Sequence, residues 1–328
     1  MEPSASRLLR DFSGSLHCFT TFVFAWLLCG AAQANGNYPV TRWVIEGDTQ
    51  SFSLSAKTLA HPNPWDRAHQ WLCANAVSKN IQGIIGTGDI IYRYGTFGSD
   101  LTSSLRLEER AADYAYDITD ACGLASILPA GNHDVYGLTH GYSGPPNNTD
   151  RYLGFMKTRP LHRPVKKSPT GLSWTWGLAP NFSLLVLPWA ANAAEESWAR
   201  TTIANSPSAE RFFIFQHEGI TPTLLPTIPS WIPAGRLAAQ FGQRKVPMVI
   251  GGHHLQTDMV QSRLNSLGQR GLFVNFQEMD PRTNYSQPFW GYVVWLEYHH
   301  STGKWCFWDE NVLTGEKNRF EPTTCWVP

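Results

Sequence analysis

Ligand-type side chains follow the ends of short apolar segments at five places in this 328-residue chain. In chain order, these groups are Asp48-Thr49-Gln50, Gly88-Asp89, Gly131-Asn132-His133-Asp134, Gln216-His217 and Gly252-His253-His254. A mixture of carboxylate, amide and imidazole ligands suits Zn, Mn or Fe better than Ca. An Asp between two such groups can bridge a pair of ions about 3.5–4 Å apart, which activate water and stabilise an in-line displacement at phosphorus.

Each of these residues also has a purely structural interpretation. Asp48 and Asp89 could cap loops or helices after strands, and His217 or His253 alone would be an ordinary core or rim histidine. Residues 131–134 could form a simple turn. The joint occurrence of all the groups, in order and after apolar segments, favours the metal-binding interpretation.

The segments that precede these groups predict an α/β fold. Helical patterns cover residues 65–79 and 105–121, and strands that alternate with helices indicate a sheet buried between layers. Ligands bind at the carboxyl ends of the strands in such sheets. The expected strands cover residues 42–46, 81–87, 126–129, 172–177, 183–187, 211–215, 246–250, 272–276, 291–297 and 304–308. No repeat or composition shift divides the chain, so residues 35–328 are expected to form one domain with a strand-rich C-terminal part.

Residues 1–34 have the pattern of a cleaved secretory signal peptide. A polar start with Arg7 and Arg10 is followed by an uncharged apolar run over residues 18–32 and by the small-residue site Ala32-Gln33-Ala34. The alternative is an uncleaved anchor, but the run is shorter than the about 20 residues of a membrane-spanning helix. We therefore expect a secreted or periplasmic protein whose mature chain has no membrane span.

Four cysteines follow that segment, namely Cys73, Cys122, Cys306 and Cys325. An even number of cysteines in an exported chain suggests disulfides, and closeness in sequence favours the pairs Cys73–Cys122 and Cys306–Cys325. Four buried free thiols are the alternative. A cysteine zinc site is not expected, because no C-x-x-C spacing is present.

The charge balance excludes some classes of partner. Lys and Arg together number 26, as do Asp and Glu, so the formal net charge is zero, and only 16% of residues are charged. The chain is too apolar to be disordered, and it has no positive excess to attract nucleic acid. An anionic substrate would therefore be held by local cations rather than by the field of the whole protein.

The order of the motifs resembles the calcineurin-like metallophosphoesterases over residues 42–256. The resemblance implies a four-layer α/β/β/α sandwich of two mixed sheets flanked by helices. It implies two ions of Zn, Mn or Fe, bridged by Asp89, with Asp48 on one ion and with Asn132, His217 and His253 on the other. It also implies that His133, oriented by Asp134, contacts the phosphate or protonates the leaving group.

Two departures from the family pattern fall on the same metal position. The usual D-x-H is Asp48-Thr49-Gln50 here, in which the Gln50 carbonyl would ligate or hold a water. The usual G-H-x-H is Gly252-His253-His254-Leu255, so either His254 substitutes by a one-residue shift or that ligand is lost. We therefore expect one tightly bound ion and one weakly bound ion.

Three further residues are candidates for contacts with substrate. Tyr92 completes a G-D-x-x-Y motif that resembles purple acid phosphatases, in which the Tyr binds ferric iron, although a pocket-wall aromatic is the alternative. Arg93 follows it, and His140 lies in a Gly- and Tyr-rich loop.

The sequence as a whole predicts an exported metal-dependent phosphoesterase. It would hydrolyse a phosphomonoester or phosphodiester, in a small molecule or an exposed group, by in-line attack of a metal-bound hydroxide. The alternative is a binding protein of the same fold with an eroded metal site, which Gln50 and Leu255 would explain. A serine hydrolase is disfavoured, because the chain lacks a G-x-S-x-G motif.

Overall fold

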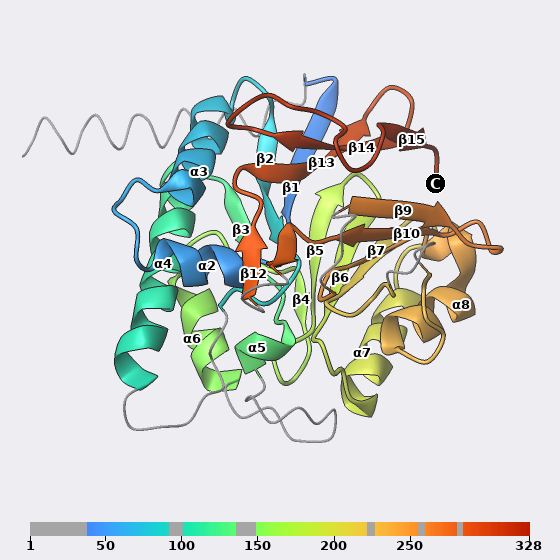
Figure 1. Ribbon diagram of the computed structural model, residues 1–328. Coiled ribbons are helices and arrows are strands. Elements are labelled where there is room, and N and C mark those ends of the chain that lie inside the picture. The colour runs from blue at the N-terminus through green and yellow to red at the C-terminus, as the bar shows by residue number, and fades with distance from the viewer. Residues whose placement is uncertain (1–37, 92–100, 136–148, 222–226, 255–259, 281–284) are drawn as a thin grey trace, which may run out of the picture. The chain divides into compact units, whose positions relative to one another are not determined.

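The computed structural model describes residues 38–91, 101–135, 149–221, 227–254, 260–280 and 285–328 (Figure 1). Within this part of the chain, Val40–Pro328 forms one compact unit. The expected signal segment 1–34 lies outside the described residues, and so do Tyr92, Arg93, His140 and Leu255. None of the described helices has the length and hydropathy that a membrane span requires.

The first of two mixed sheets has six strands in the order β15-β14-β13-β1-β2-β3. β1, β2 and β3 run parallel to one another, whereas β13 pairs antiparallel with β1 and β14, and β14 with β15. The strands are β1 (Val40–Glu46), β2 (Ile81–Gly86), β3 (Ala125–Ile127), β13 (Tyr292–His299), β14 (Lys304–Asn311) and β15 (Thr324–Trp326).

The second sheet has seven strands in the order β4-β5-β6-β7-β8-β10-β9. Its central strands β6, β7, β8 and β10 are parallel, and antiparallel strands close both edges. The strands are β4 (Lys166–Lys167), β5 (Trp174–Ala179), β6 (Phe182–Leu187), β7 (Arg211–Gln216), β8 (Met248–Gly251), β9 (Val260–Leu264) and β10 (Arg270–Val274). A separate two-stranded sheet pairs β11 (Gln277–Asp280) with β12 (Tyr285–Pro288).

Helices flank the two sheets on opposite sides (Figure 1). α3 (Pro64–Asn75) and α4 (Leu101–Ala121) cover the first sheet, and α7 (Ala193–Ala204) and α8 (Pro233–Lys245) cover the second. Shorter helices are α2 (Gln50–Ala56), α5 (Asn132–Val135) and α6 (Thr149–Thr158). The arrangement confirms the expected α/β/β/α sandwich.

Helix α3 shows how the local sequence sets an element's bounds. Asn63 forms a capping box, since its side chain accepts backbone N–H groups at the helix start while the Asp66 side chain accepts the Asn63 N–H. The expected helix ran to residue 79, but α3 ends at Asn75, and Asn80 beyond it has a φ of 51°. The Asn80 amide donates to the Val40 carbonyl at 2.7 Å, which ties this turn to β1.

The aromatic side chains form much of the core. One cluster of buried residues includes side chains from both sheets and from α3 and α4, and a second lies between the second sheet and the α7–α8 layer. The largest fully buried side chains include Trp65, Trp174, Trp295 and Trp305. The high aromatic content of the chain is therefore explained mainly by packing.

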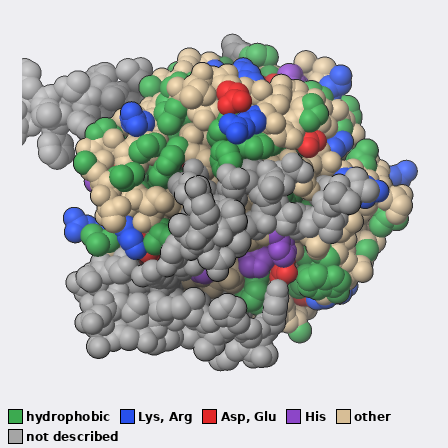
Figure 2. All heavy atoms as spheres, in the orientation of Figure 1, with side chains coloured by type: hydrophobic (Ala, Val, Ile, Leu, Met, Phe, Trp, Pro, Cys, Tyr) green, Lys and Arg blue, Asp and Glu red, His purple; other side chains and the backbone are tan. Residues whose placement is uncertain are grey.

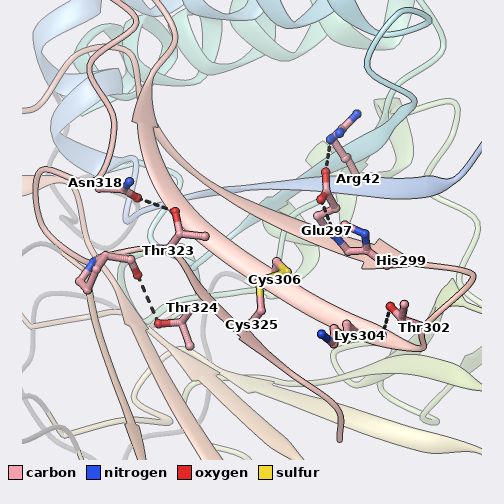
Figure 3. The surroundings of a disulfide bond; sticks show 11 residues. Arg42, Glu297, His299, Thr302, Lys304, Cys306, Asn318, Thr323, Thr324 and Cys325 are labelled. Carbon is pink, nitrogen blue, oxygen red and sulfur yellow. Dashed lines mark hydrogen bonds and ion pairs between the residues drawn. A yellow bond between two sulfur atoms is a disulfide. The ribbon is translucent and has the colours of Figure 1, made fainter.

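Two disulfides link neighbouring elements, in the pairing favoured by the sequence. Cys73 on α3 bonds to Cys122 just after α4, with a Cα–Cα distance of 5.7 Å. Cys306 on β14 bonds to Cys325 on β15, directly opposite in the strand register, with a Cα–Cα distance of 4.1 Å (Figure 3). The bonds fit an extracellular or otherwise oxidising environment.

Replacing both Cys73 and Cys122 by Ser should lower the free energy of unfolding by about 2–5 kcal/mol, because the unfolded chain regains the entropy of a closed loop. The separation is 49 residues for this pair and 19 for Cys306–Cys325. We therefore expect a smaller loss for the second double variant. Urea unfolding under non-reducing conditions measures both losses, and unchanged midpoints would contradict the expectation.

Candidate metal centre

The parallel strands of both sheets lead into the predicted ligand residues. β1 and β2 are followed by Asp48 and Asp89, and β3 is followed by Asn132 at the start of α5. In the second sheet, β7 and β8 are followed by His217 and His253. Figure 2 shows histidine side chains gathered together, with an acidic side chain beside them, on the face seen in Figure 1.

His217 Nε2 lies at the centre of the candidate site. It is 3.1 Å from Asp89 Oδ2, 3.1 Å from Asn132 Oδ1 and 3.1 Å from His253 Nδ1. Asp89, His217 and His253 form a group whose ligand atoms all lie within 4.8 Å of one another. Three potential metal ligands from two sheets thus face the same histidine nitrogen.

The other nitrogen of His217 is already used. His217 Nδ1 lies 2.5 Å from the Thr87 carbonyl oxygen, which can only accept, so the N–H proton is on Nδ1. In the neutral ring, Nε2 then carries a lone pair directed at the lone pairs of Asp89 and Asn132. Such a concentration of acceptors is stabilised by a cation, and a backbone carbonyl on the opposite ring nitrogen is the usual support of a metal-binding histidine. The donor set therefore fits a metal ion.

Two positions beside Asp89, occupied by Gly88 and Gly131, have room only for glycine. Gly88 and Asp89 have φ values of 93° and 49°, both in the left-handed region. A Cβ on Gly131 would lie 2.1 Å from Asp89 Oδ1. Asp89 Oδ1 accepts the His133 backbone N–H at 2.8 Å, while buried Asp89 Oδ2 faces His217 Nε2 at 3.1 Å. This geometry leaves Oδ2 directed into the site.

Attraction between the Asp89 carboxylate and the His217 ring shifts the pKa values of both groups. Burial by itself would raise the pKa of Asp89, but His217 and His133 hold it well below its usual range. Burial by itself would lower the pKa of His217, but the Asp89 carboxylate raises it to about 9. Burial and the charge of His217 lower the pKa of His253 to about 3. The neutral His253 ring is thus available as a ligand at physiological pH.

The second expected metal position is less complete. Asp48 is fully buried and accepts from the Gln50 side-chain amide at 3.4 Å. Gln50 Oε1 is buried without a hydrogen-bond partner among the described residues, so this carbonyl is available to a cation or a water. Asp48 belongs to neither of the ligand groups within 4.8 Å that the described residues form. The expectation of a weaker second ion therefore stays a prediction.

His133 and Asp134 are on the short helix α5, which begins at Asn132. His133 Nε2 is 4.0 Å from Asp89 Oδ2, and its side chain is 21% exposed, so it can reach both the metal position and a substrate. The Asp134 carboxylate was expected to orient the His133 ring. It accepts the backbone N–H groups of Ile90 at 2.9 Å and Gly131 at 2.8 Å, and its expected role toward the His133 ring stays a prediction. Asp134 thus fixes the two loops that carry Asp89 and His133.

The structure places His254 beside a residue that the sequence analysis missed. His254 Nε2 lies 3.7 Å from Glu218 Oε1, and Glu218, His253 and His254 form a second group of ligand atoms within 4.8 Å. Two other residues at strand ends were also missed. Asn275 follows β10 and donates to the His254 carbonyl at 2.9 Å, and the Trp189 ring lies 6.0 Å from that of His253. The sequence signal that could have identified these residues as part of the site is their position directly after parallel strands.

Raising the pH from 6.5 to 9 should destabilise the metal-free chain. The folded pKa of His217, about 9, lies above its ordinary value of 6.5. The folded state therefore binds an extra proton, and the stabilisation is present below pH 6.5 and lost as the pH rises through about 9. Chemical unfolding across this range measures the effect. A bound metal would replace this proton, so the stability of the metal-loaded chain should not decline with rising pH. Metal binding at pH 7 should also release about one proton from His217. A metal-free chain with constant stability over the range would contradict this.

Comparison with known proteins supports the fold at low sequence identity. No family model and no curated protein matches the sequence. Purple acid phosphatase PPD1 from yellow lupin (Lupinus luteus) seeds is similar with a TM-score of 0.56 and 12% identity, over 88% of this chain and 54% of that one. This chain thus spans about half the length of the plant phosphatase.

Two other solved structures match over more of their own length. A dimetal phosphatase from Danio rerio has a TM-score of 0.54 and 14% identity, over 88% of this chain and 99% of that one. GAP50, the anchor in the inner membrane complex of Plasmodium, has a TM-score of 0.50 and 10% identity, over 88% of each chain. These similarities show that the chain shares the fold of these solved structures.

Proposed function

We propose that this chain is a metal-dependent phosphoesterase. The observation that carries the proposal is the convergence of Asp89, Asn132 and His253 on His217 Nε2, each at 3.1 Å. The fold adds support, because two of the similar structures are phosphatases and one of them is a dimetal phosphatase.

In this proposal, each ligand residue has a specific place. Asn132, His217 and His253 would hold one ion, Asp48 with the Gln50 carbonyl would contribute to a second, and Asp89 would serve both. When bound, the ions would supply an activated water and neutralise charge that develops on the phosphoryl oxygens. The buried surroundings of these side chains hold the metal-ligand atoms in position before substrate binds.

His133 provides the proton that a leaving alkoxide needs, or a hydrogen bond to the phosphoryl group. Its backbone N–H is fixed by Asp89 Oδ1, and Asp134 fixes the loop through Gly131. The side chain is partly exposed while its backbone is anchored, which suits a group that must meet a substrate. Tyr92, Arg93 and His140 are proposed as additional substrate contacts on sequence grounds alone.

An assay with generic substrates tests the proposal. Para-nitrophenyl phosphate and bis(para-nitrophenyl) phosphate represent the monoester and diester classes, and Mn, Zn or Fe is added back to chelated protein. Hydrolysis of at least one class should disappear on chelation and return with metal. Folded, metal-loaded protein that hydrolyses neither class would contradict the proposal.

A binding protein with an eroded metal site is the second candidate. The similarity to GAP50, described as an anchor, motivates it, together with the glutamine at position 50. Elemental analysis separates the candidates, since a chain that binds at most one ion under metal supplementation and hydrolyses neither ester class would favour binding. Asn132→Ala should reduce the metal content in either case.

We also propose that the protein is exported after removal of residues 1–34 and that residues 35–328 form the mature domain. The two disulfides support an oxidising destination. N-terminal sequencing of the exported chain should give Asn35 as its first residue, and an intact Met1 would contradict cleavage.

A further inference from the structure

Glu218, His253 and His254 form a ligand group that the proposed catalytic centre does not require. Their ligand atoms lie within 4.8 Å of one another. Glu218 and His254 are not ligands in the proposed centre around Asp89 and His217. Glu218 is 7% exposed, and the His254 side chain is 34% exposed. The group therefore lies at the rim of the site, where an ion can enter from solvent.

The backbone holds the two contributing loops in direct contact. The Gly252 N–H donates to the His217 carbonyl at 2.8 Å, which joins the loop after β8 to the loop after β7. A Cβ on Gly251 would lie 2.9 Å from the Gly219 nitrogen and 2.7 Å from the Ile220 nitrogen. Because the loops touch through glycine backbone, Glu218 and His254 cannot separate without breaking these contacts.

A tight turn directs the two adjacent histidine rings. The His254 N–H donates to the Gly252 carbonyl at 3.0 Å, a three-residue turn, and His253 at its centre has a φ of 77°. This conformation is strained for a residue with a side chain and persists where the surroundings enforce it. The buried Asn275 amide holds the His254 carbonyl from the other side. The rings of His253 and His254 end 4.8 Å apart.

The spacing of Glu218 and His254 suits an intervening ion better than a direct ion pair. Their closest atoms are 3.7 Å apart, whereas a charge-assisted hydrogen bond measures about 2.7–2.9 Å. Two ligands at tetrahedral zinc bond lengths lie about 3.4 Å apart. Two imidazoles and one carboxylate, with open positions, are a common set for Zn and Fe.

We propose that Glu218, His254 and His253 form an additional divalent-cation site, separate from the two ion positions of the proposed centre, with Glu218 as the carboxylate ligand. His253 borders both this site and the Asp89 site. Ligating an ion in each site at once would require its ring N–H proton to be released to solvent, which would make the ring a bridging imidazolate. The proposal rests on the proposed function only in sharing His253. It explains how the one-residue shift of the second histidine leads to an alternative ion position next to the catalytic centre.

Zinc binding to the full chain, measured by calorimetric titration and elemental analysis without substrate, tests this proposal. Glu218→Gln and His254→Ala should each bind one ion fewer than the wild type, or bind that ion at least about tenfold more weakly. Asn132→Ala should instead weaken an ion of the centre around Asp89 and His217. Glu316→Gln and His300→Ala, on the loops after β14 and β13, are matched controls that should bind like the wild type.

Unchanged stoichiometry and affinity in both Glu218→Gln and His254→Ala would overturn the proposal, as would a wild type whose single ion is lost in Asn132→Ala. Circular dichroism checks that each variant is folded. If His254→Ala does not fold, the result for Glu218→Gln, which keeps the side-chain shape, decides the test. A chain that loses an ion in Glu218→Gln but hydrolyses no phosphoester as wild type would contradict the proposed function while leaving this site intact. A chain that hydrolyses phosphoesters and binds as many ions in Glu218→Gln as in the wild type would do the reverse.

Discussion

Asp89→Asn should reduce metal-dependent phosphoester hydrolysis by about a thousandfold or more. Losing one preorganised electrostatic contact to the transition state costs about a hundredfold to a thousandfold, and the proposed bridging residue would affect both ions. Asn retains the shape of Asp, so the acceptor at Oδ1 for the His133 N–H is conserved while the negative charge is removed. Metal content should also fall, because the remaining ligands of the first site are neutral.

The same variant has a readout that requires neither metal nor substrate. Asp89 is the main group that raises the pKa of His217 to about 9. Once the carboxylate is gone, burial opposes the charged ring with less compensation and the pKa of His217 should fall below about 9, which NMR titration of the ring can measure. Asp150→Asn, on the exposed start of α6, is the control. A variant that retains wild-type turnover and metal content would exclude Asp89 from the centre.

His133→Ala should lower kcat by about a hundredfold to ten-thousandfold while leaving the metal content unchanged. General acid catalysis contributes an acceleration of this order, and His133 is not among the residues grouped around His217 Nε2. Its ring lies 4.0 Å from Asp89 Oδ2 and is partly exposed. The His133 backbone N–H donates to Asp89 Oδ1 at 2.8 Å, and this contact does not depend on the side chain, so the loop should keep its position in the variant.

The leaving group distinguishes proton donation from simple charge stabilisation by His133. A substrate with an acidic leaving group, such as para-nitrophenol, needs little protonation, so it should lose less activity than an alkyl phosphate in the variant. His61→Ala, at a partly exposed histidine outside the site, serves as the control. Equal losses for both substrates would exclude the proton-donor role, and loss of metal would show that His133 supports the ions instead.

Much of the site could be predicted from residue types at strand ends. Asp89, Asn132 and His217 each follow an apolar strand, and the carboxyl ends of parallel strands meet at a common edge. The two central sheets position them as expected, and the two disulfides have the favoured pairing. Local apolar patterns were informative here because buried parallel strands leave an unambiguous signal.

The missed features depend on contacts between distant segments. Glu218 meets His254 only because glycines allow the loops after β7 and β8 to touch, and no local pattern encodes that contact. The direction of the Asp134 carboxylate depends on the positions of Gly131 and Ile90, the latter on another loop. Helix α8 was not among the expected helices, and it begins at Pro233, a position in a helix that proline favours.

A crystal structure of metal-loaded protein, with anomalous scattering recorded at the metal edge, tests the central claim most directly. We predict an anomalous peak at about 2.0–2.2 Å from ligand atoms of Asp89, Asn132, His217 and His253. A second peak beside Glu218 and His254 is expected if the further site binds as proposed. Well-ordered side chains at these four positions, without a peak between them in crystals that contain the metal, would contradict the account.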